Sequence, residues 1–234
     1  MTSGSEVHHQ HRSVTGGWLR PTVFGMMDGL VSNFALIAGV AGAKADSTAV
    51  ALAGLAGLVG GAFSMATGEY VSVQSQNESA HAEIEIERRE LRVNAAAEQA
   101  ELAQSFVDRG VDPTVADQVA EQISRDPDEA LSVHAMAEFG VNPRALPSPW
   151  TAAGSSFASF TVGAIIPLLP YLFGATSLLA SGILSVVALF AAGALTAQFT
   201  SRSWIFSGTR QLLLGTFAAA VTYGVGSLFD AITG

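Results

Sequence analysis

Apolar residues occur in five long runs separated by short polar stretches or, once, by a long one. Each run is close to the roughly 20 residues that a helix needs to cross the hydrocarbon core of a bilayer. Lys44 and Asp46 mark the turn after the first run, and residues 174–176 mark the turn after the third. The pattern predicts an all-α membrane protein with five transmembrane helices, at about 22–43, 49–73, 151–173, 177–199 and 208–230.

The positive charges indicate how these helices are oriented. If the N-terminus is cytoplasmic, the segments on that side carry every arginine of the chain, and Lys44 alone falls on the other side. Cytoplasmic loops are enriched in Lys and Arg. We therefore expect the N-terminus and the long polar segment to be cytoplasmic, and the C-terminus to lie outside.

The long polar segment, residues 78–147, is called the acidic module below. Its fifteen Asp and Glu and six Arg give it a charge of −9, which is the formal charge of the whole chain. Nucleic acid is a poor partner for it, because phosphate binding needs a basic surface. We predict that transmembrane helices flank it at 17–77 and 148–234.

Three helices are predicted in the acidic module. The first continues the second transmembrane helix to Val93, the second stops at Gly110, and Gly140 closes the last. Asp followed by Pro is a typical helix start, and it occurs at Asp112-Pro113 and again at Asp126-Pro127.

Composition narrows the classes of protein further. Hydrophobic residues make up 49% of the chain and charged residues 13%, against about 25% charged in soluble domains. The absence of cysteine excludes disulfides and thiol chemistry. Residues 1–16, with His8, His9 and His11, are predicted to be a disordered tail, too polar for a signal peptide.

A polar stripe follows the second predicted transmembrane helix into the acidic module. At about 100° per residue, Arg88, Arg89 and Arg92 point away from it and do not neutralise its glutamates. The stripe predicts a cation path, although a solvated glutamate-rich helix is the alternative and is favoured for Glu78, Glu83 and Glu85. Within about 40° of Met65 lie Glu69, Ser72, Gln76, Glu83, Glu87 and Glu90.

Candidate metal ligands of the acidic module come in closely spaced groups. Glu87 and Glu90 are three residues apart, as are Glu98 and Glu101, and such residues share a helix face. Two pairs on packed helices could surround a cation with four carboxylates. The last module helix adds His134 and Glu138 on one face, with Met136 about 200° from His134.

The apolar runs contain ligand-type residues of their own. The first run holds Asp28, and an unpaired Asp there costs about 2.5–3.5 kcal/mol on insertion scales, which marks a functional site. Met65 and Glu69 share one face of the second run. A thioether beside carboxylates suits Fe²⁺, Mn²⁺, Co²⁺ or Zn²⁺ better than Mg²⁺ or Ca²⁺.

Four stretches of the chain resemble the vacuolar iron transporter family. They are FGMMDGLVSNFALIAGVAGA at 24–43, GAFSMATGEYVSVQSQ at 61–76, GAIIPLLPY at 163–171 and SGTRQLLLGTFAAAVTYGVG at 207–226. The resemblance implies a homodimer with a conduit at its interface, in which Asp28 and Met65 match the conduit residues. The glutamates of the family's metal-binding domain match Glu87, Glu90, Glu98, Glu101 and Glu138.

The chain departs from the family's pattern at two places. The family often has two adjacent methionines before the last of these glutamates, where this chain has His134 and Ala135. It also often has a glutamate early in the second transmembrane helix, where this chain has Gly57.

The function that the resemblance implies is exchange of Fe²⁺, and also Mn²⁺, for protons, which moves metal out of the cytosol. No enzyme activity or prosthetic group is expected, and the membrane is the plasma membrane in a bacterium or the vacuolar membrane in a eukaryote. Two alternatives stay open. A di-iron oxidase would use Glu-x-x-His, which the sequence lacks, and a membrane-anchored metal sensor or scaffold would bind metal without transport.

Overall fold

Most of the described chain is helical. The structure, a computed structural model, describes residues 17–199 and 201–233, which hold eight α-helices, one short 3-10 helix and no strand. The predicted tail at 1–16, with its histidines, lies outside the described residues. The described residues form two compact units, one up to Val71 and from Pro149 onward, the other Ser72–Ser148.

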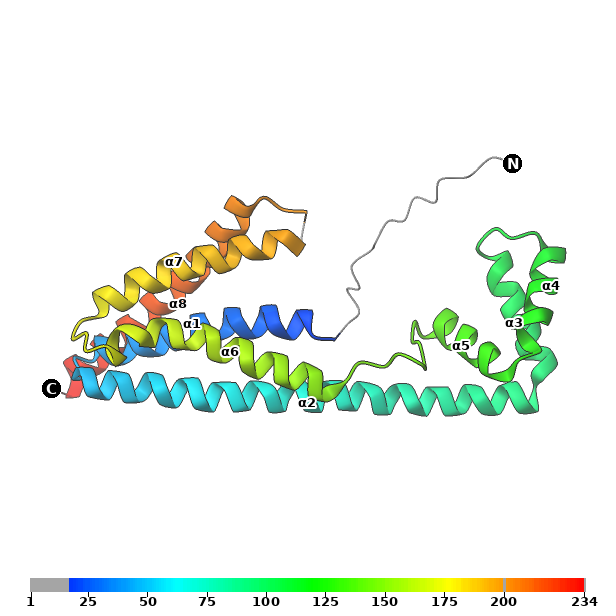
Figure 1. Cartoon of the computed structure of the whole chain (residues 1–234), viewed down its shortest axis with the longest axis horizontal. Helices are drawn as coiled ribbons and strands as arrows, with labels where there is room; N and C mark the ends of the chain where they lie inside the picture. Colours follow the sequence, from blue (N-terminus) through cyan, green and yellow to red (C-terminus); the bar gives the residue numbers. More distant parts are fainter. Residues whose placement is uncertain (1–16, 200, 234) are drawn as a thin grey trace. The chain divides into compact units, whose positions relative to one another are not determined.

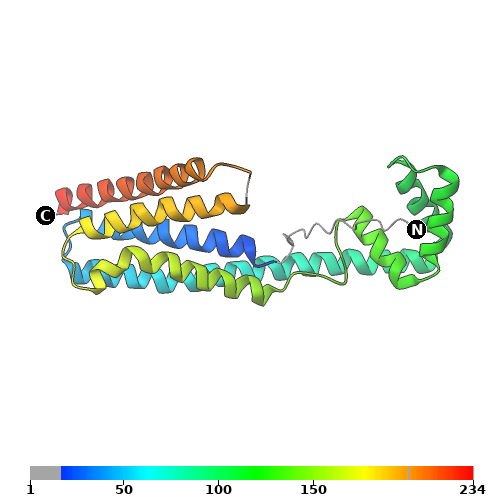
Figure 2. The same cartoon turned by 45° about the horizontal axis from the view of Figure 1, so that its top comes forward.

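The first unit consists of long helices that run side by side (Figures 1 and 2). Five helices of the chain are long and apolar enough to cross a membrane, which confirms the predicted number. The fourth is followed by the 3-10 helix η1, Ala197–Phe199. The five are α1 (Leu19–Gly42), α2 (Ser47–Val93), α6 (Pro149–Leu172), α7 (Leu178–Thr196) and α8 (Trp204–Thr233).

Helix α1 lies at the centre of this unit because small residues let neighbouring backbones approach it. A Cβ on Gly29 of α1 would lie 2.2 Å from the carbonyl oxygen of Phe160 in α6. A Cβ on Gly226 of α8 would lie 1.9 Å from the carbonyl oxygen of Gly39 in α1. Such close contact through small residues is typical of packed membrane helices.

The unit is apolar on the outside as well as at its core. Leu30 and Phe34 of α1 pack in the core with Leu189 of α7. On the outer faces, large side chains such as Leu213 and Phe217 are 64% and 70% exposed. Soluble proteins rarely expose so much apolar surface, so these faces are suited to contact with lipid.

The second unit holds the end of α2 and three shorter helices, α3 (Ala95–Val107), α4 (Pro113–Ser124) and α5 (Pro127–Glu138). Leu102 of α3 and Ala116 of α4 are buried together in its core. The segment after Gly110, which is predicted to form one last helix, forms the two helices α4 and α5. Asp126 is extended, as a residue before proline tends to be, and its side chain caps α5 by accepting from the Asp128 N–H at 3.0 Å.

Candidate metal centre

Four ligand-type side chains meet inside the second unit. Glu87 comes from α2, Glu98 from the first turn of α3, and His134 and Glu138 from α5. One ligand atom from each lies within 4.8 Å of the ligand atoms of the others. The i, i+4 spacing on α5 puts His134 and Glu138 on one face, as the sequence predicts. These four residues are called the Glu/His cluster below.

Three carboxylates of the cluster converge on one ring nitrogen. His134 Nδ1 lies 3.1 Å from Glu87 Oε1, 3.3 Å from Glu138 Oε1 and 3.7 Å from Glu98 Oε2. A single N–H cannot donate a good hydrogen bond to all three oxygens. Glu87 Oε1 makes no hydrogen bond within the described part of the chain. Two ligands each about 2.1 Å from a divalent metal lie roughly 3.0–3.4 Å apart, so the spacing fits a shared cation.

The cluster is electrostatically unfavourable without a cation. His134 is 1% exposed and Glu87 is 6% exposed. Burial, with the charge of Glu138 as a second cause, raises the pKa of Glu87 to about 7, while His134 acts in the opposite direction. Burial also raises the pKa of Glu98, with Glu101 as the next cause. A raised pKa means that these carboxyls tend to keep their protons. A bound metal would replace those protons and relieve the repulsion between the carboxylates.

The other residues expected in this site surround the cluster or lie outside it. The carboxylate of Glu90 accepts a hydrogen bond from Asn94 Nδ2 at 2.5 Å, Glu101 is exposed, and Met136 is 50% exposed. Glu90 and Glu101 still lie close enough to raise the pKa of Glu98. The structure thus brings in one glutamate of each pair, with His134 and Glu138, in place of four paired carboxylates.

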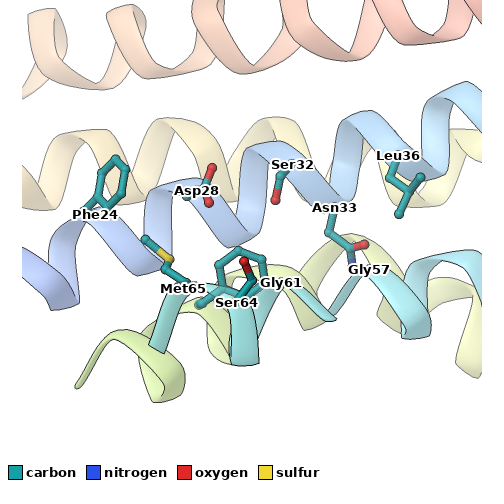
Figure 3. Close-up of a pocket in the computed structure, with 10 residues that line it drawn as sticks. Phe24, Asp28, Ser32, Asn33, Leu36, Gly57, Gly61, Ser64 and Met65 are labelled. Carbon is teal, nitrogen blue, oxygen red and sulfur yellow. The ribbon is translucent and has the colours of Figure 1, made fainter. Parts of the chain in front are cut away.

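The ligand-type residues of the apolar runs meet in the first unit. Asp28 of α1 and Met65 of α2 line one groove of about 360 Å³, and Figure 3 shows Met65 reaching from α2 toward α1. We call it the membrane groove. Glu69, one turn further along α2, is partly exposed and is not among the residues that line it.

Three further polar side chains line the membrane groove. None of the three is predicted as a metal ligand from the sequence. Ser32 and Asn33 come from α1, and Ser64 comes from α2. A signal was present in the sequence, because Ser32 is four residues from Asp28, one turn along the same face, and Ser64 precedes Met65. Serine is common in membrane helices for packing reasons alone. The spacing therefore does not distinguish Ser32 and Ser64 from serines that only pack.

Known proteins similar to this chain agree on one class. It is 37% identical over 230 residues to "Vacuolar iron transporter" of Acanthamoeba castellanii, covering 95% of this chain and 84% of that protein. It is 32% identical to "Vacuolar iron transporter 1" of Oryza sativa subsp. japonica, with 95% and 90% covered. It is also 32% identical to "Vacuolar iron transporter" of Centaurea cyanus, with 93% and 90% covered. The family model that matches residues 19–227 takes in four of the candidate membrane helices and most of α8, and the chain therefore belongs to the VIT family.

Proposed function

We propose that this protein moves Fe²⁺, with Mn²⁺ as a second substrate, out of the cytosol in exchange for protons. The observation that carries the proposal is the Glu/His cluster, whose four ligand atoms lie within 4.8 Å of one another on a chain with five candidate membrane helices. The relatives named as iron transporters support iron as the substrate. In this proposal the metal is cargo, and the protein is neither an enzyme nor the carrier of a prosthetic group.

The acidic module acts in this proposal as the collector on the cytoplasmic side. Carboxylate oxygens with one imidazole nitrogen form a donor set that suits Fe²⁺ and Mn²⁺. Glu87, Glu98 and His134, with Glu138, hold the cation, and the charges of Glu90 and Glu101 raise the local concentration of cations. Met136 is half exposed on α5, and the proposal does not depend on it.

The membrane groove provides the path across the bilayer. Asp28 supplies a carboxylate and Met65 a thioether, and Glu69 lies on the same face of α2 as Met65. A second copy of the chain against this groove would give a homodimer with two Asp28 and two Met65 around one path, as the family resemblance implies. Carboxylates must lose their protons before they bind metal, so metal and protons compete for them, and an acidic outer side would favour release.

Metal selectivity in vesicles tests this proposal. Liposomes that hold the purified protein should take up Fe²⁺ and Mn²⁺, and should take up little Mg²⁺ or Ca²⁺, because a thioether and an imidazole suit neither of the latter ions. Empty liposomes give the background. Tight binding of Mn²⁺ to the protein without uptake would overturn transport and would favour a metal sensor.

A further inference from the structure

One buried polar atom in the membrane groove is not accounted for by packing. Asn33 is 2% exposed in the middle of α1, and its Nδ2 donates a hydrogen bond to the Ala164 carbonyl oxygen of α6 at 2.6 Å. That bond fixes the orientation of the amide, because the reverse orientation would set two oxygens against each other. The amide oxygen, Oδ1, has no hydrogen-bond partner among the residues that the structure describes.

The unpaired oxygen points at a space that Gly57 leaves open. A Cβ on Gly57 of α2 would lie 2.8 Å from Asn33 Oδ1 and 2.5 Å from Leu36 Cδ2, so a side chain there would displace the amide, the end of Leu36, or both. Figure 3 shows the Asn33 side chain reaching from α1 toward Gly57. Both residues line the membrane groove together with Asp28 and Met65. The oxygen is therefore directed into the same groove as the expected metal ligands.

A structural role for Asn33 explains only half of its amide. The bond from Nδ2 holds α1 against α6, but it leaves the buried acceptor Oδ1 without a hydrogen bond. A buried acceptor without a partner costs about 1–3 kcal/mol. A cation in the groove would repay that cost, since amide carbonyl oxygens are ordinary ligands for divalent metals. An amide also supplies an oxygen ligand without the cost of another charge inside the membrane.

We propose that the carbonyl oxygen of Asn33 binds the transported cation in the membrane groove, and that Gly57 is small to leave room for it. The inference rests on the proposed function and adds a ligand to it. Asn33 then belongs to the transport path with Asp28 and Met65, on the side of the groove that faces Gly57.

Moving the amide from one helix to the other separates this role from the structural one. Asn33→Ala should lower the initial rate of Mn²⁺ uptake by liposomes, at Mn²⁺ well below saturation, by about tenfold or more. Asn33→Ala combined with Gly57→Asn returns a carbonyl to the same space and should recover most of the rate. The bond to Ala164 is lost in both proteins, so a recovery cannot come from that bond.

Two controls complete the experiment. Asn33→Ala with Gly57→Val restores volume without an oxygen and should stay slow. Ser156→Ala removes another fully buried side chain whose oxygen lacks a partner within the described chain, but outside the groove, and should transport normally. Thermal unfolding of each purified variant checks that it is folded.

The outcomes distinguish this inference from the proposed function. No Mn²⁺ uptake by the wild-type protein would overturn both. Wild-type uptake that Asn33→Ala leaves unchanged, or equal recovery with Gly57→Asn and Gly57→Val, would overturn the role of Asn33 alone.

Discussion

Replacing Glu87 with glutamine should change stability and metal binding in opposite directions. Folding raises the pKa of this carboxyl from its ordinary value of 4.5 to about 7, chiefly through burial. Its folded pKa lies above the unfolded one, so the contribution of Glu87 to stability is fully present below pH 4.5 and is lost as pH rises through 7. Above pH 7, the metal-free protein bears the full cost of an ionised, buried Glu87.

The size of that cost follows from the shift in pKa. At 1.36 kcal/mol per pKa unit, a shift from 4.5 to about 7 corresponds to at most about 3 kcal/mol. Glu87→Gln removes the charge, and so should stabilise the metal-free protein by up to this amount at pH 8 and by almost nothing at pH 4.5. The same change removes a ligand, and should lower the affinity for Mn²⁺ by about tenfold or more.

Thermal unfolding of the full chain in detergent measures both effects. With a chelator, Glu87→Gln should raise Tm by several degrees at pH 8 and leave it unchanged at pH 4.5. With Mn²⁺ at pH 8, the metal-induced rise in Tm should shrink relative to the wild type. Glu83→Gln removes the same charge from an exposed position one turn earlier on α2 and should do neither. A lower Tm for metal-free Glu87→Gln at pH 8 would refute the reasoning.

Other substitutions test the remaining parts of the account. Asp28→Asn should abolish Mn²⁺ uptake by liposomes while the metal-induced rise in Tm persists; normal uptake would remove Asp28 from the path. Glu98→Ala should weaken Mn²⁺ binding, measured by calorimetry, about tenfold more than Glu101→Ala, because only Glu98 belongs to the cluster; equal losses would count against that assignment. His134→Met should lower affinity for Mn²⁺, which prefers harder ligands than a thioether, and unchanged affinity would show that His134 does not bind the metal.

The membrane helices could be predicted from the sequence because their signal is local. Predominantly apolar runs of the right length occur nowhere else in the chain, and Asp46 and Gly174 mark two of the turns between them. The helix extension to Val93 was predictable for a similar reason, since no turn signal interrupts α2 before that residue. The prediction of a single last module helix is wrong, although Asp126-Pro127 is as strong a start signal as Asp112-Pro113.

The composition of the candidate metal centre depends on packing, which spacing alone does not determine. Glu87 and Glu90 share a face of α2, yet α5 packs so that His134 reaches Glu87, while Asn94 bonds Glu90 at the helix end. The proposed role of Asn33 could not be predicted from the sequence for the same reason. Its unpaired oxygen becomes visible only when Ala164 is seen to hold the other end of the amide.

The central claim is that metal crosses the membrane in exchange for protons. Its most direct test is simultaneous recording of Mn²⁺ and pH inside liposomes that hold the purified protein, with Mn²⁺ added outside and the interior acidified in steps. The account predicts Mn²⁺ entry that speeds up as the interior becomes more acidic, with protons leaving in proportion and both movements lost in Asp28→Asn. Mn²⁺ entry that ignores the pH gradient and moves no protons would contradict it.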